Sequence, residues 1–267
     1  MTTMNETDEK ELLGMVLRIE RSSIYDGEGF RTVVFLKGCP LRCQWCSTPE
    51  SQSFQIESTA ESVYGKQMTV EQVMVEVRKD SAFFFHSGGG MTISGGELLA
   101  QPDFSRALVR MSWNECIDTA IETSFFSTWE IVSSILPYVN TAFVDLKIFN
   151  DEMHRKYCGG GNKQILENLL RTNEIKKSDG EPPFRLVVRT PIIPGINDRA
   201  EELEQIGRFC SELRYLDHVQ LLPYHRLGTD TYRKLGRRYA FPDLESPSAE
   251  RMAECRAYVQ KYIPQVI

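Results

Sequence analysis

The amino-acid sequence predicts an α/β fold, a partial (β/α)6 barrel of the TIM-like kind. Two observations support this prediction. Short runs rich in β-branched and aliphatic residues alternate along the chain with longer segments in which apolar residues recur at helical spacing. Such alternation gives a parallel sheet, and right-handed crossovers curl that sheet towards a barrel. Since six strand–helix units fall short of the eight in a closed barrel, we expect the barrel to be open.

Each predicted element follows from its own residues. Strands are expected at 15–20, 31–36, 91–94, 116–123, 141–147, 184–193 and 218–224, and helices near 102–113, 127–137, 162–174, 198–213 and 248–261. Another helix is expected after Thr69, a residue type that favours the N-cap, because apolar residues follow it at helical spacing. Residues 1–13 are expected to be a polar, frayed lead-in, and 47–67 to be irregular. The whole chain, 1–267, is expected to form one domain.

Composition and charge exclude several classes of protein. Of the 267 residues, 41% are hydrophobic and 25% are charged, which is typical of a soluble globular protein and not of a disordered or fibrous one. No apolar run approaches the roughly 20 residues that cross a bilayer, and the acidic N-terminus does not look like a secretory signal. A net charge of −6 argues against nucleic acid as the main partner, because phosphate contacts need clustered Lys and Arg. We therefore expect a cytoplasmic monomer that binds neither nucleic acid nor membrane.

Three cysteines in one short loop give the most specific signal. Cys39, Cys43 and Cys46 form a C-x3-C-x2-C pattern just after a predicted strand. An odd total of seven cysteines, in a chain without a secretory signal, favours metal-binding or catalytic thiols over disulfides. Cysteine thiolates are the usual ligands of iron–sulfur clusters, and three of them leave one iron of a four-iron cluster open to another ligand. Zinc remains the weaker alternative, because structural zinc commonly takes four protein ligands.

The other cysteines do not form a second cluster motif. Cys116, Cys210 and Cys255 fall in strand-like or helical runs and are interpreted as small core residues, as free cysteines often are. Cys158 lies outside those runs.

The cysteine motif, with Trp45 before its last cysteine, resembles the signature of radical S-adenosylmethionine enzymes. The likeness extends from about residue 15 to 262, through YDGEGFRTVVFLKGCPLRCQWC, SGGGMTISGGE, FVDLKIFNDEMHRKY, RTPIIPGIND and LLPYHRLG. In this combination the chain is similar to the activating enzymes of glycyl radical enzymes. The resemblance implies a radical SAM core and an oxidoreductase of anaerobic metabolism, in which one 4Fe–4S cluster reductively cleaves S-adenosylmethionine. The 5′-deoxyadenosyl radical that results would take a hydrogen atom from a glycine of a partner protein.

The resemblance also assigns roles to single residues. It makes Cys39, Cys43 and Cys46 the catalytic cluster ligands, and it places the methionine end of the cofactor at the SGGE turn. The complete set of expected cofactor contacts is Trp45, Gly95, Gly96, Glu97, Glu122, Thr123, Asp145, Lys147, Arg189 and His225. A monovalent cation near Glu122 and Thr123 is part of the same expectation.

The residues themselves support several of these roles. Polar side chains at the carboxyl ends of barrel strands usually face a site, which fits Glu122, Asp145 and Lys147. Arg189 lies in an otherwise apolar strand and must find a carboxylate or a ligand, because an unpaired buried charge is costly. The alternative for Asp145 and Lys147 is an ordinary solvated ion pair.

Two further stretches are interpreted with an alternative beside each. By resemblance, Asp26 in the DGEG turn contacts the backbone of the partner's glycine loop; by itself the stretch predicts only a turn. His154 matches a histidine of the family, and a structural role at a helix end is equally compatible with its position. The SGGG stretch at 87–90 is interpreted as a flexible turn.

Segment 47–51 is most similar to activating enzymes that contain an inserted domain with two extra clusters. Only 18 residues separate Cys46 from Gly65, and none of them is cysteine, so we expect no inserted ferredoxin-like domain and one cluster per chain. Electrons would then come directly from a flavodoxin or a ferredoxin. Two alternatives remain at this stage: a radical SAM enzyme that acts on a small molecule or nucleotide, and a non-enzymatic iron–sulfur or zinc module.

Overall fold

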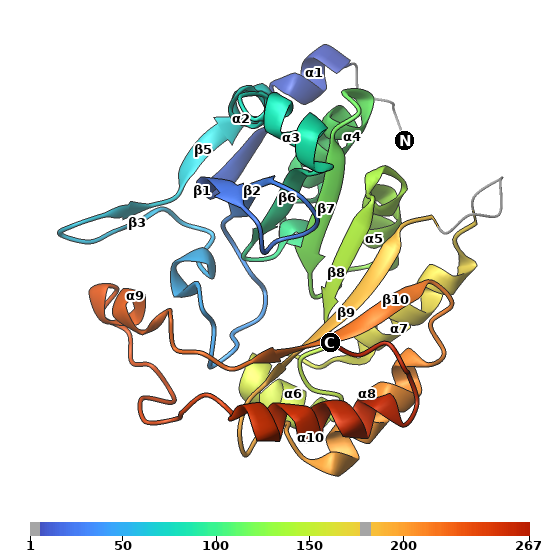
Figure 1. Ribbon diagram of the computed structural model, residues 1–267. Coiled ribbons are helices and arrows are strands. Elements are labelled where there is room, and N and C mark those ends of the chain that lie inside the picture. Colours follow the sequence, from blue (N-terminus) through green and yellow to red (C-terminus); the bar gives the residue numbers. More distant parts are fainter. Residues whose placement is uncertain (1–5, 177–182) are drawn as a thin grey trace. The chain divides into compact units, whose positions relative to one another are not determined.

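The computed structural model describes residues 6–176 and 183–267, and the contacts within it divide the chain into two compact units (Figure 1). The first unit comprises the chain up to Pro40, Glu50–Thr123 and Trp129–Ala142. The second comprises Leu41–Pro49, Ser124–Thr128 and Phe143–Ile267. Both units mix strands with helices, and the predicted α/β class is confirmed.

Parallel strands form the centre of the first unit. β2 (Arg31–Leu36), β6 (Gly90–Gly95) and β7 (Asp118–Thr123) pair in parallel, with Val34 opposite Ile93 and Ile93 opposite Ile121. These three side chains have no exposed area, as expected for a parallel sheet that is covered on both faces. β1 (Leu13–Ser23) runs antiparallel to β2 and also pairs with β5 (Lys66–Thr69), so the strand order in this unit is β7-β6-β2-β1-β5.

Some helices of the first unit were predicted from the sequence and others were not. They are α1 (Glu6–Lys10), α2 (Val70–Arg78), α3 (Ser81–Ser87), α4 (Pro102–Asn114) and α5 (Trp129–Ile135), with short 3-10 turns at Leu98–Ala100 and Leu136–Tyr138. α2 starts after Thr69, as predicted. The Thr69 hydroxyl accepts a hydrogen bond from Gln72 N, and the Gln72 side chain accepts one from Thr69 N, which completes a capping box.

Parallel pairing also organises the second unit. β9 (Arg185–Ile192) and β10 (Leu216–Pro223) are parallel, with Val188 opposite Val219. β8 (Thr141–Asp145) crosses the boundary between the units, and just beyond its end Leu146 N donates to Arg189 O at 2.9 Å. The helices are α6 (Asp151–Cys158), α7 (Lys163–Arg171), α8 (Ala200–Cys210), α9 (Thr229–Lys234) and α10 (Ala249–Gln260), with a 3-10 turn at Thr172–Glu174.

The two longest helices of the second unit, α8 and α10, lie side by side (Figure 1). A Cβ atom on Gly207 would come within 3.1 Å of the Val259 carbonyl oxygen, so the glycine permits the close approach. Among the described residues, no helix combines the length and the hydropathy that crossing a membrane requires.

Several short elements were not predicted from the sequence. Segment 47–67, expected to be irregular, contains the first two residues of β5, a 3-10 turn at Pro49–Ser51 and a hairpin of β3 (Glu57–Ser58) and β4 (Val63–Tyr64). α3, α6 and α9 have six to eight residues each, too few for a periodic apolar pattern to stand out. In the segment predicted to be a frayed lead-in, residues 6–10 form α1.

One cysteine prediction is wrong. Cys116 is exposed and has a φ of 56° in the turn after α4, so β7 begins only at Asp118. The apolar run that suggested a buried strand position therefore includes two residues of the turn. Cys210 and Cys255 are fully buried, as predicted.

The Thr69 cap gives a test of the local stability of the first unit. Thr69→Ala should lower the free energy of unfolding by about 1 kcal/mol, because the amide of Gln72 loses its acceptor. Thr69→Ser keeps a hydroxyl and should remain close to wild type. Urea unfolding measures both, and equal losses in the two variants would contradict the capping role.

Candidate active site

The SGGE turn at the end of β6 is built on close backbone contact. Gly95 has a φ of 113°, and a Cβ atom on it would lie 2.3 Å from Leu36 N. A Cβ atom on Gly96 would lie 2.3 Å from Gly38 O. Because neither residue has a Cβ atom, Gly96 N can donate to Leu36 O at 2.9 Å and Glu97 N can donate to Gly38 O at 2.8 Å. The two glycines therefore let this turn bond directly to the segment that leads into the cysteine loop.

Polar residues of β6 and β7 meet at the carboxyl ends of these strands. The Thr123 hydroxyl donates to Glu97 Oε1 at 2.6 Å, and the Ser94 hydroxyl donates to Glu122 Oε2 at 2.5 Å. Glu97 is only 2% exposed. The structure thus brings the predicted residues Glu97, Glu122 and Thr123 to one edge of the sheet, where carboxylates can bind an ammonium group or a cation.

Cys39, the first cysteine of the motif, belongs to the first unit and has a half-buried side chain. Cys39 N donates to Gln52 O at 3.2 Å, and Gly38 N donates to Ser51 O at 2.7 Å. The preceding Lys37 is fully buried and pairs with Glu57 at 2.9 Å. The start of the cysteine loop is therefore fixed by its backbone and by the ion pair of the buried Lys37.

Cys43 and Cys46 belong to the second unit, where the loop lies against the end of α6. Arg42 N donates to Cys158 O at 2.7 Å, and Gln44 N donates to Tyr157 O at 3.0 Å, so Cys43 is held from both sides. Trp45, between the two ligands, is 8% exposed and packs in the interior.

The surroundings of these two thiols disfavour the free thiolate form. A hydrogen bond with the Cys158 thiol, together with burial, raises the pKa of Cys43 well above its usual value, although the Lys147 cation acts in the opposite direction. Burial, followed by the neighbouring Cys43, raises the pKa of Cys46 to about 11, and hydrogen bonds from Thr48 offset part of that increase. Metal ligation requires thiolates, so binding of a cluster would displace both protons.

A three-membered ion network joins the carboxyl end of β8 to the middle of β9. Asp145 accepts from Lys147 Nζ at 2.7 Å and from Arg189 Nε at 3.1 Å. Burial disfavours the charged forms of Asp145 and Lys147. The attraction of opposite charges outweighs that cost, so the pKa of Asp145 is lowered and the pKa of Lys147 is raised. Their side chains are only 22% and 17% exposed, so the alternative of an ordinary solvated pair does not describe them.

The predicted histidines have different surroundings. His225 follows β10 and is exposed, so its ring is accessible to a ligand. His154 is fully buried in α6, and its Nδ1 lies 2.6 Å from Gly160 O, which as an acceptor requires a proton on Nδ1. Its Nε2 is buried without a hydrogen-bond partner, and burial lowers the pKa of the ring. His154 is therefore a neutral histidine that stabilises the end of α6.

Asp26 lies in a turn with several hydrogen bonds. Its carboxylate accepts from the Ser23 hydroxyl, and its carbonyl accepts from the Thr92 hydroxyl at 2.7 Å. Arg31 is 1% exposed; its Nε donates to Thr92 Oγ1 at 2.6 Å and its Nη1 donates to Glu28 O at 3.1 Å. A buried arginine therefore fixes the DGEG turn to β6.

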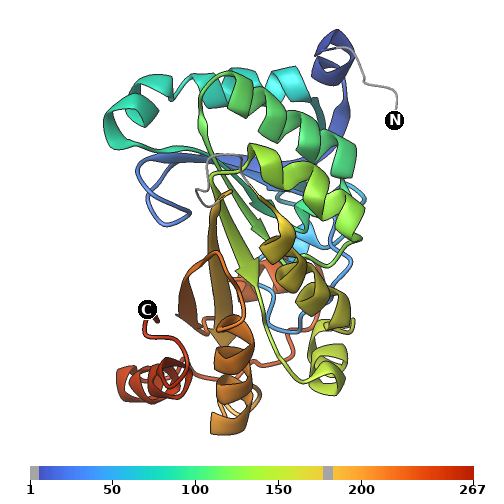
Figure 2. The same ribbon diagram turned by 90° about the vertical axis from the view of Figure 1, so that its right-hand side faces the viewer.

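The packing of α3 and the SGGG stretch against the DGEG turn was not predicted from the sequence. The Ser87 hydroxyl accepts from Phe30 N at 2.9 Å, and a Cβ atom on Gly89 would lie 1.9 Å from Phe30 O. The rings of Phe30 and Phe83 stack at 4.9 Å, and Figure 2 shows α3 beside the loop that precedes β2. The SGGG stretch is thus the packing surface for the DGEG turn, in contrast to the flexible turn that was predicted. Only the run of three glycines could have indicated such close backbone contact.

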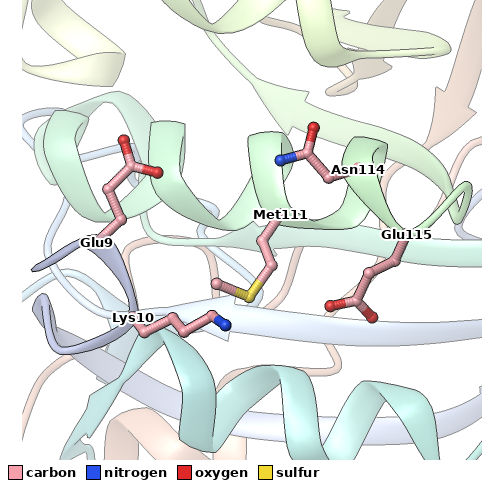
Figure 3. A pocket seen from close by; sticks show the side chains of 5 residues that line it. All are labelled: Glu9, Lys10, Met111, Asn114 and Glu115. Atoms are coloured by element: carbon pink, nitrogen blue, oxygen red, sulfur yellow. The ribbon is translucent and has the colours of Figure 1, made fainter. Parts of the chain in front are cut away.

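A small surface pocket lies away from all of these residues. Figure 3 shows its lining: Glu9 and Lys10 from α1, Met111 and Asn114 from α4, and Glu115. Glu115 pairs with Arg78 at 2.6 Å, so this carboxylate already has a cationic partner. None of the five residues is a predicted site residue.

The three cysteines fit an iron–sulfur cluster by their chemistry. Thiolates from one loop suit iron and sulfide, and the backbone of the loop is held by hydrogen bonds on both sides of Cys43. Within 6–176 and 183–267, no three His, Cys, Asp or Glu side chains are arranged around a single metal ion. A four-iron cluster does not require such an arrangement, because each thiolate binds a different iron.

Comparisons with known proteins show the family of this chain. Residues 33–210 match the family model of the radical SAM superfamily. The isethionate sulfite-lyase activating enzyme of Oleidesulfovibrio alaskensis is 36% identical over 92% of this chain and 93% of its own length. The pyruvate formate-lyase-activating enzyme of Clostridium pasteurianum is 29% identical over 96% of this chain and 99% of its own length. A solved domain of a pyruvate-formate lyase-activating enzyme from Bacteroides vulgatus covers 67% of this chain and 98% of that domain, with a TM-score of 0.55 and 25% identity.

The alignments with these two relatives differ in how many positions lack a residue of this chain. The alignment with the Oleidesulfovibrio alaskensis protein spans 300 positions but includes 92% of 267 residues, about 246, so about 54 positions have no residue of this chain. The alignment with the Clostridium pasteurianum protein spans 256 positions and includes 96% of this chain, about 256 residues, so it leaves no comparable gap.

Fold, cysteine loop and relatives together define the class of protein as a radical SAM enzyme with a partial α/β barrel. The chain belongs to the radical SAM superfamily and, within it, to the activating enzymes of glycyl radical enzymes. Of the predicted functions, this one is confirmed, and the small-molecule enzyme and the non-enzymatic module are set aside. Members of this family use a 4Fe–4S cluster and S-adenosylmethionine, as the resemblance implied.

The Asp145 network generates a prediction about stability and pH. Asp145→Asn should lower the free energy of unfolding at pH 7 by about 1–3 kcal/mol, because two cations lose their charged partner. The pKa of Asp145 is lowered from its usual 3.8, so its contribution to stability is present above that value and is lost as the pH falls through the pKa of the folded protein. The difference between wild type and variant should therefore shrink below about pH 4.

Urea unfolding of both metal-free proteins at a series of pH values measures this difference. Asp103→Asn is the matched control, because the Asp103 side chain is 67% exposed in its pair with Arg106 and the pair should contribute little. A difference for Asp145→Asn that stays constant into strong acid would contradict the network's role.

Proposed function

We propose that this chain activates a glycyl radical lyase that cleaves a carbon–sulfur bond of a sulfonate. Support comes from its 36% identity, over almost the whole of both chains, with the isethionate sulfite-lyase activating enzyme. The single observation that supports activation most directly is the loop of three cysteines that precedes a glycine-rich turn with a buried glutamate. A cytoplasmic monomer is proposed, with flavodoxin or ferredoxin as its electron donor.

The residues described above fit the two cofactors of the family. Cys39, Cys43 and Cys46 would hold the cluster, which when reduced supplies the electron that cleaves S-adenosylmethionine. The carboxylate of Glu97 suits the cofactor's ammonium group, and the backbone of Gly95 and Gly96 has no side chain to obstruct it.

Lys147 and Arg189, two cations of the second unit, are proposed to bind the cofactor's carboxylate. Lys147 and Arg189 are held there by their shared partner Asp145, which limits their movement before any ligand binds. His225 and Trp45 complete the proposed contacts, and a monovalent cation near Glu122 and Thr123 is part of the same proposal. Each of these roles is a proposal that binding measurements on single variants can test.

We further propose that the chain is one radical SAM domain with one cluster. The support is the cysteine-free stretch between Cys46 and Gly65, and the gap of about 54 positions in the alignment with the longer relative. The shorter relative, which aligns without such a gap, is the better guide to the cofactor content.

Metal analysis tests the cluster count. Anaerobically reconstituted protein should contain about four irons and four sulfides per chain, the content of one cubane. About twelve irons would show that more than one cluster is bound, and zinc without sulfide would reject the functional proposal as a whole.

Electron paramagnetic resonance tests the partner. Reduced protein, S-adenosylmethionine and an isethionate sulfite-lyase should give a glycyl doublet on the lyase with stoichiometric 5′-deoxyadenosine. A pyruvate formate-lyase under the same conditions should give a much weaker signal. The reverse preference would reject the sulfonate lyase as partner while leaving the activating function intact.

Asp26 is proposed to hydrogen-bond the backbone of the partner's glycine loop. Asp26→Ala should reduce the rate of glycyl radical formation about tenfold at subsaturating partner, the effect of losing one charged hydrogen bond. Cleavage of S-adenosylmethionine without partner should be unchanged. Asp26→Asn tests whether the turn itself is disturbed, and Asp103→Ala is the control; a loss of partner-free cleavage in Asp26→Ala would contradict a role confined to the partner.

A further inference from the structure

A basic stretch of chain follows β10 in the second unit. Segment 226–238 contains five cations and one carboxylate, in a chain whose net charge is −6. The carboxylate, Asp230, pairs with Arg233 and, at 3.3 Å, with Lys234, so it cannot neutralise both cations. The segment therefore has an excess of positive charge, against the acidic balance of the whole chain.

This segment lies against the Cys46 end of the cysteine loop. A Cβ atom on Gly228 would come within 2.6 Å of Ser47 O and 3.0 Å of Cys46 O, so the two backbones are in contact. Arg237 Nη1 donates to Pro49 O at 2.6 Å. All of these residues belong to the second unit, and their contacts place the positive charge beside the loop.

Two further cations lie at the Cys43 end of the loop. The side chains of Arg42 and Lys156 are both exposed. Arg42 N donates to Cys158 O at 2.7 Å, and Gln44 Nε2 donates to Lys156 O at 3.0 Å. Exposed positive charge therefore borders both ends of the part of the loop that contains Cys43 and Cys46.

An exposed apolar side chain lies within this basic surface. Leu227 is 82% exposed and follows Arg226, which is exposed as well. An apolar centre with a polar rim is typical of protein–protein interfaces. Electron-transfer complexes are among those that bury little area, and complementary charge guides the encounter of their partners. A protein that reduces the cluster must approach the loop that would hold it, and this surface borders that loop.

We propose that this basic surface, formed by Arg42, Lys156 and segment 226–238, docks an acidic protein that carries a one-electron centre. The proposal deepens the proposed function and rests on it, in that a cluster is bound and its electron comes from outside the chain. In the step one electron passes from the reduced donor protein to the oxidised cluster. The donor is oxidised by one electron, no covalent bond changes and no proton moves.

Charge reversal at two exposed positions, in the variants Lys156→Glu and Arg238→Glu, tests the docking surface. Binding of an acidic flavodoxin to the anaerobically reconstituted protein, measured by isothermal titration calorimetry at low salt, should weaken about fivefold in each variant. The difference should shrink at about 0.5 M salt, because salt screens exposed charges. Activation of the lyase should fall when flavodoxin is the donor and stay unchanged with dithionite, a small reductant that needs no docking surface.

Arg214→Glu is the matched control. Arg214 is exposed and precedes the amino end of β10, whereas segment 226–238 follows its carboxyl end, so the same change of charge is made at the opposite end of the strand. This variant should bind flavodoxin as the wild type does.

Flavodoxin binding at the wild-type level in both Lys156→Glu and Arg238→Glu would overturn the proposal. A loss of activation that persists with dithionite would overturn it by assigning the surface to the lyase, and loss of oligonucleotide binding alone would assign it to nucleic acid. Absence of a glycyl radical with wild-type protein and dithionite would reject the proposed function instead.

Discussion

The parallel direction of the strands determines where the polar side chains of this protein can lie. Parallel strands end at the same edge, so residues at or just beyond the carboxyl ends of β6 and β7 come together in the first unit without being close in sequence. In the second unit the last residue of β8 lies beside the middle of the neighbouring β9. Glu97 meets Thr123 in this way, and Asp145 meets Arg189. Each unit therefore offers one polar edge beside an apolar sheet.

Burial then decides what those polar groups can do. Asp145 is charged because two cations offset the cost of its burial, and the same charges keep Lys147 protonated. For Cys43 and Cys46, neighbouring charges and hydrogen bonds do not offset the cost of burying a thiolate, so both thiols favour the protonated form until a metal replaces the proton.

Close backbone packing supplies the remaining constraint in the first unit. Gly95, Gly96 and Gly89 stand where a Cβ atom would collide with another backbone segment. The first two attach the SGGE turn to the cysteine loop, and the third attaches the SGGG stretch to the DGEG turn. The DGEG turn and the SGGE turn, two motifs of the family, are therefore connected through the SGGG stretch, whose sequence suggested only flexibility.

The α/β class, the main strands and helices, and the family could all be predicted from the amino-acid sequence, because they depend on local periodicity and on short motifs such as the three-cysteine loop. Only the folded structure shows that Asp145 is shared between Lys147 and Arg189, that the cysteine loop pairs with the end of α6, and that Cys116 is exposed. Such contacts join residues from separate elements, whose distance in space follows from packing and not from spacing along the chain. The short helices α3, α6 and α9 belong with them, since packing stabilises them more than any apolar pattern of their own.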